Sequence, residues 1–496
     1  MTRSFRPHLL WALALALAFA GSGVLRAAEG EYEGDAVEPA VVDIEVTFQH
    51  GDWFSPWQDQ RLIQVSGSGF LIAPQRIMTN AHVVSDAKQI LVRRSAQSQP
   101  YFAKVEFIAH DSDLAILKIA DPEFDRGVTP LVIGGLPTLR SHVRTYGFPA
   151  GGDRISRTEG VVSRVQFVTY MHSGVDNHLA VQTDSAINPG NSGGPVMQDG
   201  KVVGVAFQTN TRLAGVGFFI PTPVIKRFLT DIRDGHYDGY AELGVSTSNL
   251  LNPVYREYLG MPAGMEGVAV DRLLPRASAE GFVEPEDVLL AIDDYPISFD
   301  GSIKYFGYNL NFDQIAEQKQ IGETVKLTLW RKRSRIDVTI PLKGLPDADR
   351  IRSRFDVEPA YLIYAGLVFM QLDQEYLNTF GDYWQNADKH LLYAQFYRPV
   401  EQPSVPPGTV VLTRVLPASI NRGYRNFANL MVSTVNGQRV STLTELDKAL
   451  ASAKGPTVEI VLQPGGIEIV LDREAARRDE AELLSAYGIP KDRRLP

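Results

Sequence analysis

The second half of the chain contains one short pattern twice. Residues 268–275 (VAVDRLLP) resemble residues 410–417 (VVLTRVLP), and residues 292–297 resemble residues 435–440 at nearly the same spacing. Similar segments that recur in the same order indicate two copies of one structural module. This duplication constrains the fold strongly, because it divides the 496-residue chain into a leading domain and two related modules instead of one large core.

The part of the chain before the duplication consists of short apolar stretches that alternate with polar residues and are separated by Gly, Pro and Asn. Many short strands at such spacing are typical of an antiparallel barrel or sandwich. A helix that opens at Thr222-Pro223 and ends at Asp234-Gly235 closes this region. We therefore predict the following segments: an acidic linker over 29–40, a first domain over 41–235, modules over 240–345 and 355–472, and a helical tail over 473–496.

The N-terminus has the pattern of a signal peptide over residues 1–28. Arg3 and Arg6 precede an apolar run from Leu9 to Ala20, and small residues follow. A membrane span needs about 20 apolar residues, so this run is too short for the alternative, an uncleaved anchor. We expect export to the periplasm, with secretion as the less favoured destination, and no stable membrane span after cleavage.

Composition removes several classes of chemistry. The chain has no cysteine, which excludes disulfide scaffolds, thiolate zinc sites and cysteine nucleophiles. Its formal net charge of −9, from 49 basic and 58 acidic residues, argues against nucleic acid as a partner, because phosphate binding needs a basic face. The sequence contains no evident metal-ligand cluster and no phosphate-binding loop, so we expect neither a metal nor a cofactor.

Three segments together indicate a serine nucleophile with its base. His82 lies in the segment TNAHVV, Asp113 precedes the apolar stretch LAIL, and Ser192 lies in the glycine-rich loop NPGNSGGP. A serine hydroxyl needs a base to take its proton, and the base needs a carboxylate that fixes its tautomer. Glycines around the serine allow backbone N–H groups to form an oxyanion hole, for which we expect Gly190, Asn191 and Ser192.

Two alternatives compete with this triad. Asp111 could replace Asp113, and its neighbour His110 could be mistaken for the base, but both lie in a polar approach to the strand and are expected to be solvated. The G-x-S-x-G pattern around Ser192 also occurs in α/β-hydrolases, where the serine comes first in the chain and a helix follows it. Here the serine comes last and a strand over 202–206 follows, which disfavours that class.

These segments resemble the signature segments of the HtrA/Deg serine proteases and occur in the family's order. The most specific is QTDSAINPGNSGGP over 182–195, and the stretch YLIYAGLVF over 361–369 resembles the Deg subgroup, whose second PDZ domain is diverged. The resemblance implies a mainly β protein, with a chymotrypsin-like double β-barrel followed by two PDZ-like α+β modules. It further implies an ATP-independent serine endopeptidase that degrades misfolded or damaged envelope proteins, assembled as a homotrimer or a multiple of it.

The resemblance also assigns roles to further positions. It makes His82 the general base, Asp113 the orienting carboxylate and Ser192 the nucleophile. Ile187 matches the base of the S1 pocket, and Val205-Ala206-Phe207 matches the strand with which a substrate pairs. Because these substrate-binding positions carry no charge, we expect cleavage after small or medium apolar residues.

The modules are expected to bind peptides through a short glycine-containing loop that holds a terminal carboxylate. Leu243-Gly244-Val245 occupies the family position of this loop in the first module, and residues 365–368 occupy it in the second. The family's Gly-Asp pair is replaced by Glu286-Asp287 in the first module, and the acidic residue is absent after Asn429 in the second. These departures weaken the expectation of peptide binding, most of all for the second module, and leave the first as the expected site for peptide C-termini.

Other features leave alternatives open. The aromatic-rich stretch 361–397 is either an interaction surface or, as we favour, the filling of an enlarged core. Trp53, Phe54 and Trp57 belong either to a regulatory loop or to a trimer contact. The basic run 331–335 is expected to be a solvated turn and not a nucleic-acid site. A chaperone or peptide-binding scaffold with minor proteolysis is the alternative function.

Overall fold

The computed structural model describes residues 36–496 apart from residues 96, 98, 150–153, 210–215, 346–351, 403 and 407. The predicted signal peptide and most of the acidic linker lie outside the described residues. Within the described part, no helix is both long enough and apolar enough to cross a membrane.

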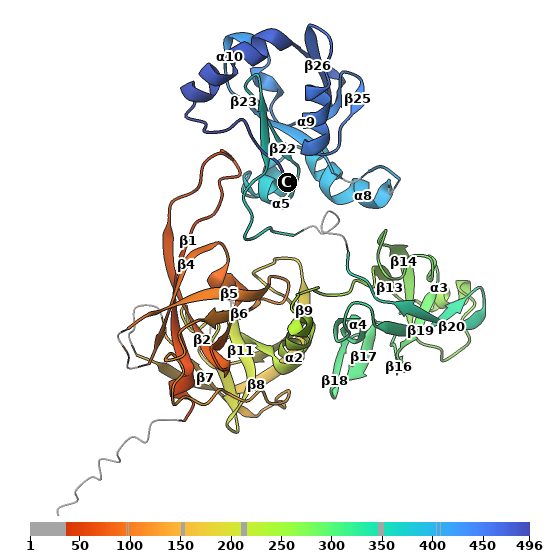
Figure 1. Ribbon diagram of the computed structural model, residues 1–496. Helices are drawn as coiled ribbons and strands as arrows, with labels where there is room; N and C mark the ends of the chain where they lie inside the picture. Colours follow the sequence, from red (N-terminus) through yellow and green to blue (C-terminus); the bar gives the residue numbers. More distant parts are fainter. Residues whose placement is uncertain are drawn as a thin grey trace, which may run out of the picture. The chain divides into compact units, whose positions relative to one another are not determined.

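The first six strands close into a barrel in the order β1-β2-β3-β6-β5-β4 (Figure 1). Their bounds are β1 Val41–Phe48, β2 Ile63–Ala73, β3 Arg76–Thr79, β4 Ala87–Arg94, β5 Tyr101–Ala109 and β6 Leu114–Ile119. The alternation that predicted these strands also sorts their side chains, because Ile44 and Val46 of β1 are buried whereas Glu45 between them is exposed. A single turn of helix, α1 (Ala81–Val84), connects β3 to β4.

The next six strands close into a second barrel in the order β10-β11-β12-β9-β8-β7. Their bounds are β7 His142–Gly147, β8 Ser156–Thr169, β9 Asn177–Thr183, β10 Pro195–Gln198, β11 Lys201–Thr209 and β12 Gly217–Pro221. Helix α2 (Thr222–Asp231) follows, and a 3₁₀ turn (Ile232–Asp234) ends at Gly235, whose φ of 96° is left-handed. This helix begins and ends where the sequence predicted.

The duplicated segments form two sheets with the same strand order. The first is β13-β14-β15-β19-β20 and the second contains β22-β23-β24-β26-β27, so that both halves of the repeat lie on equivalent strands. The first module comprises β13 Val245–Asn249, α3 Pro253–Tyr258, β14 Val268–Leu273, β15 Val288–Ile292, β16 Tyr295–Pro296, β17 Ser302–Tyr305, β18 Tyr308–Asn311, α4 Asp313–Glu317, β19 Thr324–Arg331 and β20 Ser334–Pro341. The predicted duplication is therefore present in the fold.

The second module is larger than the first because of insertions around the shared strands. It comprises β21 Tyr361–Tyr364, β22 Leu367–Gln371, α5 Gln374–Asn378, α6 Tyr383–Asn386, α7 Lys389–Leu392, a π turn at Tyr393–Tyr397, α8 Arg398–Glu401, β23 Val410–Val415, β24 Leu430–Val435, β25 Gln438–Arg439, α9 Leu443–Ala451, β26 Thr457–Gln463, β27 Ile467–Asp472, α10 Arg473–Ala486 and β28 Arg493–Arg494. Thr442 and Glu445 cap α9 reciprocally, as their spacing predicted.

The C-terminal segment is part of the second module. Helix α10 buries Ala476 and Leu483 against it, and β28 pairs with β21. The boundary that we predicted at residue 472 therefore does not separate a tail from the module, because the segment completes both the core and the sheet.

The aromatic residues of the second module divide into two groups. Tyr361, Phe369 and Tyr376 are buried, as the core-filling interpretation requires, whereas Trp384 and Tyr397 are about half exposed. Of the earlier tryptophan-rich loop, Trp53 and Trp57 pack against a buried cluster of the second module, and the guanidinium of Arg414 lies 3.7 Å from the ring centre of Phe54.

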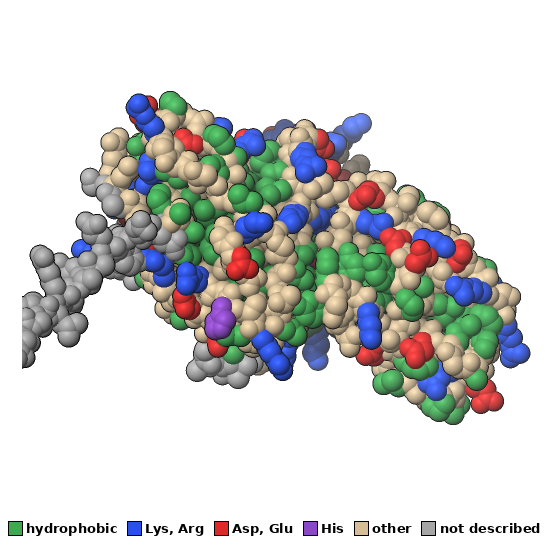
Figure 2. Space-filling view, turned by 90° about the horizontal axis from the view of Figure 1, so that it is seen from below, with side chains coloured by type: hydrophobic (Ala, Val, Ile, Leu, Met, Phe, Trp, Pro, Cys, Tyr) green, Lys and Arg blue, Asp and Glu red, His purple; other side chains and the backbone are tan. Residues whose placement is uncertain are grey.

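The predicted basic turn forms between β19 and β20, but it is not wholly solvated. Lys332 and Arg333 form the turn with φ of 48° and 66°. Arg331 instead donates two hydrogen bonds to the buried carboxylate of Asp287, at 2.7 and 2.5 Å. On the face shown in Figure 2, Lys and Arg side chains are scattered among Asp, Glu and hydrophobic side chains.

Candidate active site

His82 lies on the single helical turn that follows β3. The two residues before the turn anchor it. Thr79 Oγ1 donates to the Ser68 carbonyl at 2.7 Å, and Asn80 Nδ2 donates to the Asp113 carbonyl at 2.9 Å. These bonds fix the short helix α1 against β2 and β6, although four residues alone would not hold a helix.

Asp113 contacts His82 with both carboxylate oxygens. Oδ1 accepts the backbone N–H of His82 at 2.8 Å, and Oδ2 lies 2.7 Å from His82 Nδ1. Asp113 is buried at the entrance to β6 and has a left-handed φ of 53°, a conformation that aspartate tolerates better than most residues. The backbone therefore turns the carboxylate towards the imidazole.

The pair is arranged to favour charge on both partners. Burial lowers the pKa of His82, but the charge and hydrogen bond of Asp113 outweigh it and raise the pKa above its ordinary value. Burial also disfavours ionised Asp113, yet His82 holds the pKa of that carboxyl below its ordinary value. An imidazolium formed at His82 is thus stabilised, as a general base in this position requires.

Asp111 is not solvated, contrary to our expectation. It is 3% exposed, accepts a hydrogen bond from the Tyr237 hydroxyl at 2.5 Å and lies 3.7 Å from the Arg352 guanidinium. The sequence-based reason for preferring Asp113 was therefore wrong for Asp111. The structure separates the two by their contacts, since Asp113 is the carboxylate that reaches His82.

Ser192 lies on the loop between β9 and β10, which abuts the segment that carries His82. The Ser192 carbonyl accepts the Ser68 N–H at 2.8 Å. A Cβ atom on Gly193, whose φ is 85°, would lie 2.1 Å from the Ser68 carbonyl and 2.3 Å from Thr79 Oγ1. Only glycine permits this approach. Among the described residues, no hydrogen bond joins His82 to the Ser192 hydroxyl.

The expected oxyanion donors differ in whether their N–H group already has a hydrogen-bond acceptor in the protein. The Asn191 N–H already donates to the Asn188 carbonyl at 2.9 Å, so the expectation that it is a donor to the oxyanion is corrected. Gly190 has a left-handed φ of 98°, and for Gly190 and Ser192 the expectation of donors to an oxyanion stands. Their role as donors remains a proposal.

Ser68 is a residue of the site that sequence reasoning missed. It is fully buried, its Oγ donates to the Gly190 carbonyl at 2.6 Å and accepts the Phe148 N–H at 2.8 Å. This side chain thus fixes the direction of the Gly190 carbonyl in the proposed oxyanion loop. The only signal in the sequence is the glycine on either side of Ser68, which is too common to identify a role.

The expected substrate-binding residues lie beside the serine loop. Ile187 is buried, and a Cβ atom on Gly217 would lie 2.9 Å from its Cδ1. Ala206 is already engaged on both sides, because its carbonyl accepts the Gly193 N–H and its N–H donates to the Gly194 carbonyl. An incoming strand therefore cannot pair at Ala206.

Val205 is likewise paired within the barrel, with Pro195 of β10 and Ile220 of β12. The ladder between β11 and β12 shifts at Phe207, which stands out of register as a bulge. The expected pairing strand is therefore corrected at Val205 and Ala206, whose positions are occupied within the barrel, and Phe207 stays a prediction.

The first module presents an open sheet edge next to its predicted carboxylate loop. Leu243-Gly244-Val245 leads into β13, which ends the strand order of its sheet. Gly244 has a φ of 72°, and a Cβ atom there would lie 2.1 Å from Ala277 Cβ. The loop geometry therefore requires glycine at this position.

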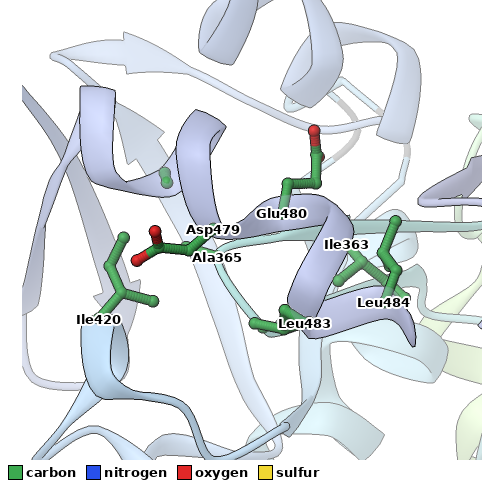
Figure 3. A pocket seen from close by; sticks show the side chains of 9 residues that line it. Ile363, Ala365, Ile420, Asp479, Glu480, Leu483 and Leu484 are labelled. Carbon is green, nitrogen blue, oxygen red and sulfur yellow. The ribbon is translucent and has the colours of Figure 1, made fainter. Parts of the chain in front are cut away.

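In the second module, both the sheet edge and the loop that correspond to the predicted peptide site are occupied by other parts of the chain. Strand β21 pairs with the outer edge of β22, with Tyr361 opposite Met370 and Tyr364 opposite Leu367. At Ala365-Gly366, helix α10 covers the loop and leaves a cavity of about 10 Å³, lined by residues that include Asp479, Glu480 and Leu483 (Figure 3). This space holds at most about one water molecule, and the two acidic side chains oppose a carboxylate.

Comparisons with known proteins agree with this arrangement. Residues 67–205 match the family model of the trypsin-like peptidase domain, and residues 351–494 match that of a PDZ domain. The chain is 34% identical to protease Do-like 4, mitochondrial, from Arabidopsis thaliana over 453 residues, which cover 91% of this chain and 84% of that relative. It is also 34% identical to protease Do-like 2, chloroplastic, from the same plant over 465 residues, which cover 92% of this chain and 74% of that relative.

Among solved structures, the HtrA-type protease AlgW with decapeptide matches 63% of this chain and 97% of that one, with 23% identity and a TM-score of 0.48. The identity to the plant proteins and their coverage carry the family assignment. The chain is a serine endopeptidase that belongs to the HtrA/Deg family of Do-like proteases.

Proposed function

We propose that the protein degrades misfolded or damaged envelope proteins without ATP, through an acyl-enzyme formed on Ser192. The observation that carries this proposal is the contact of His82 with both oxygens of Asp113, next to a glycine-rich serine loop held between two barrels. A serine nucleophile, a histidine base and an orienting carboxylate are the groups that acyl transfer of this kind uses.

The reaction follows from these groups. His82 Nε2 takes the proton of Ser192 Oγ as the oxygen attacks the peptide carbonyl, and the N–H groups of Gly190 and Ser192 stabilise the oxyanion. The protonated His82 then gives its proton to the leaving amine, which leaves an ester on Ser192. A water molecule, deprotonated by His82, hydrolyses that ester and restores the free hydroxyl.

The hydrogen bond between His82 and Ser192 forms, in this proposal, when a substrate enters, since catalytic hydrogen bonds are often completed only in the complex. A panel of fluorogenic peptides tests the expected cleavage after small or medium apolar residues, which rests on Ile187. Fastest turnover after Lys, Arg or Asp would reject that specificity.

Peptide C-termini are proposed to bind the first module, by adding a strand to β13. The open edge of β13 and the glycine-dependent loop before it support this proposal. Gly244→Ala should abolish binding of a fluorescent hydrophobic peptide, measured by anisotropy, because the new Cβ meets Ala277. Gly281→Ala is the matched control, since Gly281 also has a positive φ but no neighbouring atom within 4 Å. Equal affinity of both variants would contradict the assignment.

Periplasmic location and a homotrimeric core, or a multiple of it, remain part of the proposal. The location rests on the N-terminal sequence, while the plant relatives have mitochondrial and chloroplast names. Detection of the tagged chain in a periplasmic fraction tests export, and light scattering of the purified protein tests the assembly.

Degradation of unfolded casein separates the protease from the alternative, a chaperone or scaffold with minor proteolysis. The wild type should degrade casein, and Ser192→Ala should not, while both keep the same fold by circular dichroism. The protease proposal fails if the wild type degrades nothing and both proteins suppress casein aggregation equally.

A further inference from the structure

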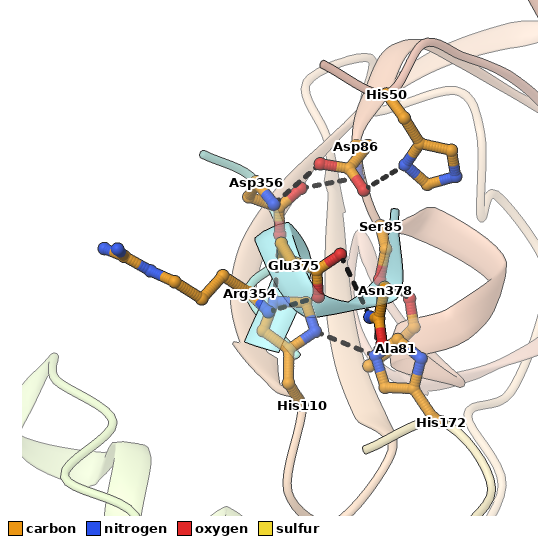
Figure 4. A network of polar contacts seen from close by, with 10 residues as sticks. All are labelled: His50, Ala81, Ser85, Asp86, His110, His172, Arg354, Asp356, Glu375 and Asn378. Carbon is orange, nitrogen blue, oxygen red and sulfur yellow. Dashed lines mark hydrogen bonds and ion pairs between the residues drawn. The ribbon is translucent and has the colours of Figure 1, made fainter. Parts of the chain in front are cut away.

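The segment over residues 352–356, which precedes the second module and is called the linker segment below, contacts the protease domain next to His82 and Asp113. Figure 4 shows its Asp356 among side chains from three separate stretches of the first barrel, with His172 of the β8–β9 connection beside His110. Its Arg354 lies beside Glu375 of α5, whose carboxylate accepts the Arg354 N–H at 3.1 Å. None of these contacts involves a triad residue directly. They include hydrogen bonds, an ion pair and ring stacking, which a connection that only spans two domains does not require.

Asp356 and Asp86 hold each other by a reciprocal pair of hydrogen bonds. The Asp86 N–H donates to Asp356 Oδ1 at 2.6 Å, and the Asp356 N–H donates to Asp86 Oδ1 at 2.7 Å. Asp86 follows Ser85, which ends α1 and donates its hydroxyl to the Ala81 carbonyl at 2.7 Å. The linker segment is thus tied to the end of the helix that carries His82.

Two carboxylates this close repel each other unless each has a positive or donating partner. His50 Nδ1 lies 2.7 Å from Asp86 Oδ2, and His110 Nε2 lies 3.0 Å from Asp356 Oδ2. Burial works against ionised Asp356, but the hydrogen bonds from His110 and from the Asp86 amide hold the pKa of its carboxyl below the ordinary value. The carboxylate form of Asp356 is therefore the one that makes the contact.

Phe355 stacks against the two histidines that flank the triad. Its ring centre lies 4.0 Å from that of His172 and 4.8 Å from that of His110, with interplanar angles of 22° and 27°. His110 Nδ1 lies 2.9 Å from His172 Nε2, and the His172 ring centre lies 6.2 Å from that of His82. Phe355 thereby packs on the two neighbouring histidines, called the histidine layer below, one of which lies next to the catalytic base.

The same segment reaches the loop that carries the catalytic carboxylate. His110 begins this loop, and Arg352 lies 3.7 Å from the buried carboxylate of Asp111, two residues before Asp113. Asp113 holds a left-handed φ, a conformation that persists only where the surroundings fix it. The linker segment therefore contacts both elements that meet in the His82–Asp113 hydrogen bond.

We propose that the linker segment positions the His82–Asp113 pair, with Asp356 anchoring the end of α1 and Phe355 fixing the histidine layer beside the Asp113 loop. These are positioning residues, because neither touches the substrate or the reacting atoms. The inference rests on the proposed reaction at Ser192, and it makes the arrangement of His82 and Asp113 depend on a segment more than 200 residues away from both along the sequence.

The test uses the full chain with Asp356→Ala and Phe355→Ala. We expect kcat on a short fluorogenic peptide to fall by about tenfold or more with KM unchanged, because a small misplacement of a catalytic group lowers the rate without altering substrate contacts. The rate at which a fluorophosphonate labels Ser192 should fall equally. The downfield proton resonance of the His82–Asp113 hydrogen bond should shift or broaden.

Glu358→Ala is the matched control, because Glu358 is an exposed acidic residue two positions further on, and its partner is Arg494 of the second module. It should behave as the wild type. Asp356→Asn keeps an oxygen that accepts the Asp86 N–H and should recover part of kcat, and no recovery would overturn the anchoring role of Asp356.

Variants that keep the wild-type kcat, labelling rate and resonance overturn the proposal, even if their melting temperature falls, because that result indicates a structural contact only. A wild type that is inert towards both peptide and fluorophosphonate would instead refute the proposed reaction, while the resonance still reports on the positioning role. The two failures are therefore distinguishable.

Discussion

Ser68→Ala isolates the contribution of the residue that connects the two barrels at the oxyanion loop. The change removes one hydroxyl and leaves the Gly190 carbonyl and the Phe148 N–H without their hydrogen-bond partner. A buried polar group that loses its partner costs about 1–3 kcal/mol. If the cost for the Gly190 carbonyl alone falls on the active arrangement of the loop, kcat decreases by roughly fivefold to 150-fold.

Steady-state cleavage of a fluorogenic peptide and active-site titration measure this effect together. We expect kcat to fall and KM to stay unchanged, because Ser68 faces the Gly190 carbonyl and not the substrate strand. Ser66→Ala, two positions earlier on β2, is the control and should keep the wild-type kcat. A Ser68→Ala enzyme within twofold of wild type, or an equal loss in Ser66→Ala, would refute the reasoning.

Three further predictions follow from the site and the first module. Asp113→Asn should lower kcat by about 10⁴-fold. It should also move the acid limb of kcat/KM to lower pH, because without the charge of Asp113 burial lowers the pKa of His82. An unshifted acid limb in a pH-rate profile would contradict this prediction. Gly193→Ala should abolish casein cleavage, whereas Gly200→Ala, with a positive φ but open space, should not. Burial and two nearby carboxylates raise the pKa of Asp313 to about 7, so the folded state loses stability relative to the unfolded state as pH rises from about 4 to 7. Asp313→Asn should therefore raise the free energy of unfolding at pH 8, on the order of 1 kcal/mol for this partly exposed side chain, and have little effect at pH 4 by urea denaturation.

The sequence was sufficient to predict that His82 and Asp113 lie together, because its signals are local. His82 follows a strand in the segment TNAHVV, and Asp113 precedes the apolar stretch LAIL, so each position could be inferred from its neighbours. Asp111 shows the limit of that reasoning. Its polar neighbours suggest solvation, but Tyr237 and Arg352 cover it, and neither is near it in the sequence.

The duplicated sheet was also predictable, since strand patterns repeat along the chain. The pairing of β21 with the edge strand β22, and of β28 with β21, was not predictable. Strand β21 and the β28 strand come from the two flanks of that module, and nothing in either short segment specifies its partner. Register between distant strands is decided by packing and backbone hydrogen bonding in the folded chain.

The two modules show how one backbone can keep its shape while its binding capacity changes. Glu286 and Asn429 stand near or at the position of the family's glycine, yet both retain a left-handed φ, of 69° and 67°. Both positions therefore hold the left-handed conformation that glycine adopts most readily, although neither is glycine. What distinguishes the modules is the edge of the sheet: β13 ends its sheet, whereas β22 is paired with β21 and its loop is covered by α10. Because a peptide strand binds through the backbone groups of an edge, covering that edge removes the binding mode while the module's core is kept.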